Sequence, residues 1–188
     1  QSSSPTAATS SFRLPAATAE WDASKTAVIL CDMWDDHYCR SAAKRVAEMA
    51  PRMNEVVKKA RAAGALIIHC PSGCMDHYAN TPQRRLAQSA SKIETTIPLE
   101  NWCHLDESRE PAMPVGVEQP CDDAGELRER IRFYNHQIET LEIAGGDAVT
   151  DSAEAYYLMK QRGIERVLVM GVHTNMCVLD RPFGIRQL

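Results

Sequence analysis

The chain has 188 residues, of which 44% are hydrophobic and 24% charged, and its formal net charge is −4 at pH 7. Length and composition are those of one globular domain with a sizeable core. The 21 lysines and arginines are scattered and outnumbered by 25 acidic residues, so we expect no nucleic-acid partner. No apolar run approaches the ~18 residues that span a bilayer, so we expect no membrane partner.

Residues 1–23 are predicted to be a flexible leader. The stretch 1–17 is rich in Ser, Thr, Ala and Pro and has no apolar periodicity. It resembles what remains after a signal peptide is removed, which would place the protein in the periplasm or outside the cell. A cytoplasmic location is the alternative. We assign residues 24–188 to the folded domain.

Strand-like and helix-like patterns alternate in the first half of this domain. The apolar run Ala27–Cys31 predicts a strand buried on both faces. Apolar residues then recur every three or four positions over 41–63, which predicts a helix that Pro51 kinks or divides and Gly64 ends. Residues 65–68 predict a second strand.

The second half begins with another helix signal and a long irregular region. Thr81-Pro82 is an N-cap followed by proline, which predicts a helix over 83–91. Residues 92–135 carry four prolines and no clear pattern, and a loop this long suggests a lid or a subunit contact. Beyond it, the patterns predict a third strand at 138–143, a helix from an N-cap at Thr150 or Asp151 to 162 with Gly163 as its C-cap, and a last strand at 166–172.

This alternation predicts an α/β fold with a parallel sheet and right-handed crossovers. Ligands bind such sheets beyond the carboxyl ends of the strands, where Asp32, His69 and the turn 172–177 are expected to meet. Cys177 is predicted to begin a helix, and unpaired N–H groups there lower the pKa of a thiol and favour a nucleophile. The alternative is a buried, inert cysteine.

The seven cysteines indicate neither a zinc finger nor a complete set of disulfides. Cys70 and Cys74 are four apart, but no second pair has the spacing of a structural zinc site. An odd number leaves at least one cysteine unpaired within the chain. A disulfide among Cys39, Cys103 and Cys121 stays open.

Two segments resemble the isochorismatase-like cysteine hydrolases. AVILCDMWDD (27–36) is similar to the first strand and acidic turn of that family, and RGIERVLVMGVHTNMCV (162–178) to its nucleophile segment. The resemblance covers about residues 24–188 and implies a Rossmann-like, three-layer α/β/α fold with a mainly parallel sheet. Family members continue with further strands and helices, so we expect C-terminal elements to be missing after Leu188.

The resemblance also implies a chemistry, which is hydrolysis of a small amide or a related bond. Cys177 would be the nucleophile and Asp32 its general base, with an oxyanion held by the backbone N–H groups of His173 and Cys177. It further implies a cis peptide at Val172–His173, a homo-oligomer, a small-molecule substrate and no cofactor. We expect the substrate pocket to be lined by Trp34, His69, Thr174 and Asn175.

Two departures from the family pattern affect this expectation. The family's catalytic lysine would fall within 138–144, where this chain has none; Arg132, His136 and Gln137 lie just upstream as alternatives. Without a cation, the carboxylate of Asp32 would raise the pKa of the thiol. The metal-binding Asp-x-His pattern of the family's nicotinamidases is also absent, so we expect no metal.

Three functions are therefore weighed. The first is a cysteine hydrolase that uses Cys177 and Asp32. The second is a protein that keeps the pocket for binding or assembly and has lost hydrolysis with the lysine. The third is a redox-sensing thiol protein that pairs Cys177 with Cys31 or Cys70.

Overall fold

The computed structural model describes residues 17–112, 121, 123, 129 and 131–188. The first 16 residues of the expected leader lie outside the described residues. The last residues of the expected leader belong to the start of the domain. The Asp22 side chain accepts a hydrogen bond from the Ser24 N–H and so caps a short 3₁₀ helix, η1 (Ala23–Lys25).

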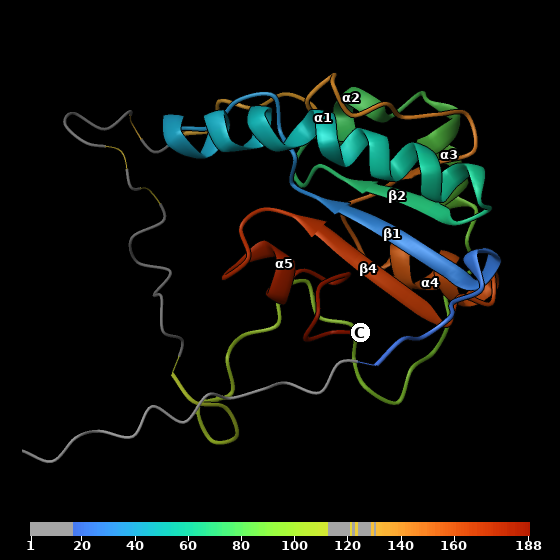
Figure 1. Ribbon diagram of the computed structural model, residues 1–188. Helices are drawn as coiled ribbons and strands as arrows, with labels where there is room; N and C mark the ends of the chain where they lie inside the picture. The colour runs from blue at the N-terminus through green and yellow to red at the C-terminus, as the bar shows by residue number, and fades with distance from the viewer. Residues whose placement is uncertain (1–16, 113–120, 122, 124–128, 130) are drawn as a thin grey trace, which may run out of the picture.

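In the described part of the chain, four parallel strands form one sheet in the order β3-β2-β1-β4. The central strands are β1 (Thr26–Cys31) and β2 (Leu66–Cys70), and β4 (Arg166–Gly171) is one edge (Figure 1). The two-residue β3 (Ala148–Val149) is the other edge. β1 is buried along its whole length, as its unbroken apolar run predicts. The expected α/β fold with a parallel sheet is confirmed.

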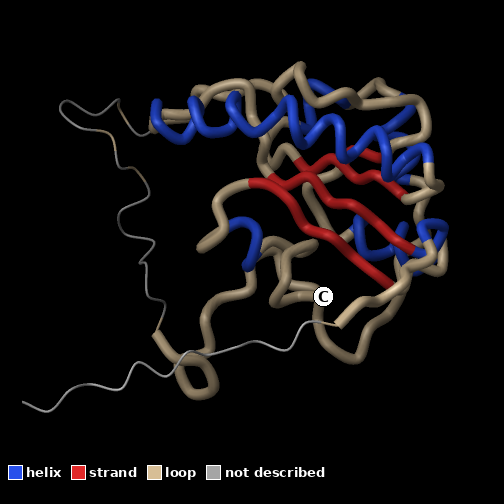
Figure 2. Tube along the Cα trace, in the orientation of Figure 1, coloured by secondary structure: helices blue, strands red, loops and turns tan. Residues whose placement is uncertain are grey.

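Helices cover both faces of this sheet, and the alternation of side chains along each strand decides which residues meet them. Val28 and Leu30 of β1 pack against Val57 of helix α1 (Arg40–Ala62). Ile29 and Cys31 belong to the core of the opposite face. The helices of that face are α3 (Pro82–Gln88), α4 (Glu154–Gln161) and α5 (Cys177–Asp180) (Figures 1 and 2).

Helix α1 is a single element of 23 residues, so the predicted division at Pro51 is wrong. Pro51 is exposed, whereas its neighbour Ala50 is fully buried. The proline ring therefore faces water, and apolar residues before and after it pack on the sheet side. Burial along this stripe outweighs the one intrahelical hydrogen bond that a proline removes. The helix ends as expected before Gly64, which has φ of +99°.

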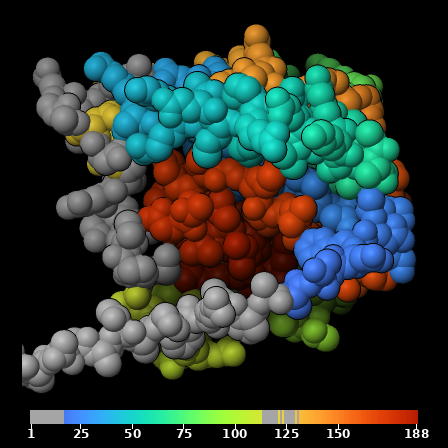
Figure 3. Space-filling view, in the orientation of Figure 1, coloured from blue at the N-terminus to red at the C-terminus, as the bar shows by residue number. Residues whose placement is uncertain are grey.

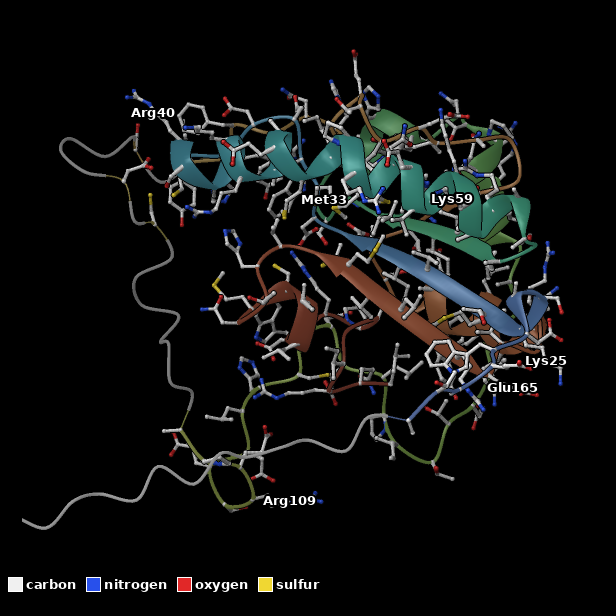
Figure 4. All side chains as sticks on the ribbon, viewed as in Figure 1. Lys25, Met33, Arg40, Lys59, Arg109 and Glu165 are labelled. Atoms are coloured by element: carbon white, nitrogen blue, oxygen red, sulfur yellow. The ribbon has the colours of Figure 1, made fainter. Side chains whose placement is uncertain are left out.

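The predicted strand at 138–143 is also wrong, because the third strand is β3 at 148–149. Residues 138–143 form turns and irregular backbone, in which Leu141 packs under α1 beside Val46 and Met33. The apolar residues of this stretch are imperfectly alternating, so they fill one side of a loop rather than one face of a strand. Met33 is labelled at the end of β1 in Figure 4.

Of the predicted helix caps, the one at Thr81 is confirmed, because its side chain accepts from the N–H of Arg84. The C-cap of α4 is Arg162 rather than Gly163, which follows it with φ of +66°. The N-cap of α4 is Ala153 rather than Thr150 or Asp151. The Thr150 hydroxyl instead donates to the Glu154 carboxylate inside the first turn. The short helix α2 (Met75–Tyr78) precedes α3.

No helix in the described ranges is both long and apolar enough to cross a membrane.

Candidate functional site

The site is built around Asp32, which immediately follows β1 and is fully buried. It has φ of +51°, a left-handed conformation that Asp adopts more readily than most residues. Its N–H continues the sheet by donating to the Cys70 carbonyl, at 3.0 Å. Its carboxylate oxygen Oδ1 accepts from the Ser72 N–H at 2.8 Å, in the loop after β2. The ends of two neighbouring strands therefore fix this carboxylate.

Cys177 approaches from the end of β4, where the chain turns through residues 172–176 into α5. The peptide Val172–His173 is cis, as expected. Gly171 has φ of +136°, and a Cβ there would lie 1.9 Å from the Cys31 carbonyl oxygen, so only glycine permits this approach of β4 to β1. Cys177 is the first residue of α5, as predicted, and is 5% exposed.

The third member of the site is Arg181, four residues after Cys177. Its Nε lies 3.6 Å from the Asp32 carboxylate oxygen Oδ2, too far for a hydrogen bond but close enough for an ion pair. Within the described part of the chain, Arg181 Nε, Asp32 Oδ2 and Ser72 Oγ are buried without a hydrogen-bond partner. Buried polar atoms are nearly always paired, so this group marks a place for water or the polar atoms of a ligand.

The charges of the three side chains act on one another. Burial and the neighbouring Asp32 carboxylate raise the pKa of the Cys177 thiol to about 12, and the Arg181 guanidinium opposes that rise. Burial raises the pKa of Asp32, which Arg181 again opposes. Cys177 is therefore a protonated thiol at neutral pH. The low thiol pKa expected from the helix N-terminus is wrong, because burial and a carboxylate outweigh a helix of four residues.

Arg181 was not among the site residues expected from the sequence. Its backbone does form the C-cap, but its side chain turns back to Asp32 and also lies over the Trp102 ring, 5.4 Å from the ring centre. A signal was present in the sequence, since Arg181 is one helical turn from Cys177 and the following proline prevents the helix from continuing.

The alternatives to the family's lysine lie elsewhere. Arg132 is exposed and donates to the Tyr134 carbonyl. His136 contacts Asp35. Gln137 bonds the ring of His69.

Of the four expected pocket residues, Trp34 lies beside the site. Its indole N–H donates to the Ser72 carbonyl at 3.1 Å, and its ring stacks on Tyr134 with 4.2 Å between centroids. The Asp32 carboxylate contributes to a raised pKa of Tyr134, after burial. Trp34 and Tyr134 therefore form an aromatic wall next to Asp32, and Tyr134 was not anticipated from the sequence.

His69 lies apart from this group. It is fully buried on the α1 side of the sheet, where its ring nitrogens bond Gln137 at 2.8 Å and Asp147 at 3.1 Å. Asp147 in turn pairs with Arg61 of α1. His69 therefore belongs to a structural network, because strand alternation turns it away from the face that carries Cys177. Thr174 is exposed and Asn175 half-buried in the turn before Cys177.

The seven cysteines all lie within the described residues, and no disulfide joins any two of them. Cys31 and Cys70 are fully buried in the same core cluster as Cys177. Burial raises the pKa values of both thiols well above their ordinary value.

Comparison of the chain with protein-family models gives no match, and comparison with curated proteins gives none either.

Proposed function

We propose that the protein is a cysteine hydrolase of a small amide or related carbonyl substrate. One observation carries the proposal: a thiol, a carboxylate and a guanidinium from two distant parts of the chain meet in one buried group. The resemblance of residues 27–36 and 162–178 to the isochorismatase-like family supports it. In this proposal Arg181 supplies the positive charge that the family obtains from lysine.

The proposed reaction begins with Cys177 as a thiol and Asp32 as a carboxylate. Asp32 accepts the thiol proton while Sγ attacks the carbonyl carbon, so no free thiolate is needed at rest. Asp32 then protonates the leaving amine as the C–N bond breaks, which leaves a thioester on Cys177. Water hydrolyses the thioester, gives a carboxylic acid and restores the thiol.

Arg181 stabilises the negative charge that the thiol and carboxylate share during this transfer. The oxyanion would be held by the N–H groups of His173 and Cys177. The His173 carbonyl accepts from the N–H groups of Met176 and Val178, which flank Cys177 in the chain. Trp34 and Tyr134 would contact a flat substrate. We also expect, from the resemblance alone, a homo-oligomer, which light scattering after size-exclusion chromatography would test.

The deciding experiment measures ammonia release from a panel of small amides and carbamoyl compounds. We expect activity in the wild type and in Cys103→Ala, a half-buried cysteine outside the site, and a loss of at least 1,000-fold in Cys177→Ala. Mass spectrometry of the quenched reaction should detect an acyl adduct on the peptide that contains Cys177. Equal rates for the wild type and Cys177→Ala would overturn the proposal.

A binding or assembly protein without hydrolytic activity is the second candidate. The specific observation in its favour is the thiol itself, which is 5% exposed and has a pKa of about 12. This function predicts that ligands bind the wild type and Cys177→Ala with equal affinity and that no substrate leaves an adduct. An adduct on Cys177 would exclude it.

A further inference from the structure

A second group of reactive side chains lies at the N-terminal end of α1. The thiols of Cys39 and Cys121 and the carboxylate of Asp123 each offer one ligand atom, and these three atoms all lie within 4.8 Å of one another. Cys39 is fully buried, and the other two are half-buried. We propose that Cys39, Cys121 and Asp123 bind a divalent cation of the zinc type.

The separations fit such an ion. Ligands placed tetrahedrally at ~2.3 Å for sulfur and ~2.1 Å for oxygen are about 3.6 Å from one another. Cys39 Sγ lies 3.7 Å from Asp123 Oδ1. All three ligand atoms lie within 4.8 Å of one another, and a change in the χ1 angle of one side chain can bring them to this spacing.

Hydrogen bonds from the first turn of α1 hold the Asp123 carboxylate in place. Asp123 Oδ2 accepts from the N–H of Arg40 at 2.7 Å, and Oδ1 accepts from the N–H of Ser41 at 2.8 Å. Arg40 is labelled at this end of α1 in Figure 4. A carboxylate has about four acceptor positions, and the position on Oδ1 that accepts from the Cys39 thiol becomes available to a metal when that thiol loses its proton. Hydrogen bonds that orient a ligating carboxylate are a usual feature of metal sites.

His37 supports the group without being one of its ligands. Its Nδ1 accepts from the Cys39 N–H at 3.2 Å, so the neutral ring carries its proton on Nε2. The ring lies 5.4 Å from that of His173, in the turn that leads to Cys177. An ion here would thus fix a segment next to the candidate active site.

The donor set selects the class of metal. Two thiolates favour zinc and similar soft or borderline ions over magnesium and calcium, which prefer oxygen ligands. Binding displaces one proton from each thiol, so one cation enters and two protons leave, while the carboxylate is already ionised. Three protein ligands leave a fourth position for water.

The test uses tag-free, reduced wild-type protein freed of metal with a chelator and titrated with Co²⁺, then with Zn²⁺ in competition. We expect a sulfur-to-cobalt charge-transfer absorption that saturates at one ion per chain, and release of two protons on zinc binding. Cys121→Ser should abolish the absorption, and Asp123→Asn should weaken binding at least tenfold. Cys103→Ser, which removes a half-buried cysteine outside the group, should leave the absorption and the binding affinity unchanged.

Cys121→Ser is the deciding variant because Cys121 is half-buried, whereas Cys39→Ser could fail to fold. Thermal unfolding of the metal-free variants checks the fold. Absence of the charge-transfer band in the wild type overturns the proposal, as does a band that persists in Cys121→Ser. A Cys39–Cys121 disulfide whose reduction restores no metal binding also overturns it. None of these measurements depends on hydrolysis.

Discussion

At the scale of single residues, the candidate site depends on the attraction between a buried carboxylate and a nearby guanidinium. Asp32 is fully buried, and the half-buried guanidinium of Arg181 lies 3.6 Å from its carboxylate. Removing one partner of such a pair leaves an uncompensated charge, which costs more than the pair itself contributes. Arg181 should therefore control both the ionisation of Asp32 and the reactivity of the Cys177 thiol.

Arg181→Met should make Cys177 less reactive, because the pKa of its thiol rises further when the guanidinium is lost. We expect alkylation of Cys177 at pH 8 to slow about tenfold, the equivalent of roughly one pKa unit. Arg181→Lys keeps the charge and should restore most of the rate. Peptide mass spectrometry distinguishes Cys177 from the six other cysteines. Arg52→Met, which removes an exposed cation of α1, is the control; equal slowing in this variant would contradict the prediction.

At the scale of elements, the joint between β1 and β4 positions the two chemical groups of the site. Cys31 is paired with Gly171, and the Val172 N–H donates to the Cys31 carbonyl at 3.0 Å. Asp32 comes directly after Cys31 in the chain, and the turn to Cys177 comes directly after Gly171. Figure 3 shows the surface of α1 adjoining that of the C-terminal part of the chain.

Gly171→Ala should separate these strands. The new Cβ would lie 1.9 Å from the Cys31 carbonyl oxygen and 2.8 Å from its carbon, and backbone cannot yield as a flexible side chain can. We expect a loss of at least about 3 kcal/mol in the free energy of unfolding by urea. Gly145→Ala is the matched control, because nothing lies within 4 Å of its Cβ. Similar losses in both variants would show that close approach is not the cause.

The N-terminus of α3 offers a second test at this scale. The Thr81 hydroxyl accepts from the Arg84 N–H at 3.1 Å and donates to the Tyr78 carbonyl at 2.8 Å. Thr81→Ala should cost about 1 kcal/mol of stability in urea unfolding, as loss of an N-cap usually does. Thr81→Ser keeps the hydroxyl and should cost clearly less. If serine and alanine are equally destabilising, the methyl group rather than the cap is what matters.

At the scale of the whole molecule, a buried ion network joins α1 to β2 and to the loop before β3. Asp147 is 1% exposed and accepts from Arg61 at 2.9 and 2.6 Å and from the Ala144 N–H at 2.8 Å. Its other partner is His69. Hydrogen bonds with His69 and Arg61 lower the pKa of Asp147 to about 2 despite its burial.

Because of this low pKa, the free energy of unfolding should decrease as the solution becomes acidic. Because the pKa of the folded state lies below that of the unfolded state, the stabilisation is complete above about pH 4 and is lost as pH falls towards 2. It amounts to about 2 kcal/mol. In unfolding experiments from pH 7 to 2, Asp147→Asn should be less stable at pH 7 and lose less on acidification. Asp76→Asn, an exposed carboxylate, should follow the wild type; a parallel curve for Asp147→Asn would refute the assignment.

Local patterns were sufficient for much of the fold and for two members of the site. β1, β2, β4 and α1 follow from apolar periodicity, and Asp32 and Cys177 from their places at strand ends. The two-residue β3 was missed, because a strand that short has no periodicity of its own. Pro51 was overvalued, because burial of the whole apolar stripe outweighs one lost hydrogen bond.

The sequence by itself determined the alternation of strands and helices, and with it the edge of the sheet at which Asp32 and Cys177 lie. Only the tertiary structure decided which cation accompanies them, which face His69 occupies, and that Cys39, Cys121 and Asp123 come together. The physical reason is the separation along the chain over which each interaction acts, since periodicity and capping involve only a few neighbouring residues. Ion pairs and side-chain clusters form between distant segments that the folded backbone brings together, so spacing along the chain does not by itself decide them.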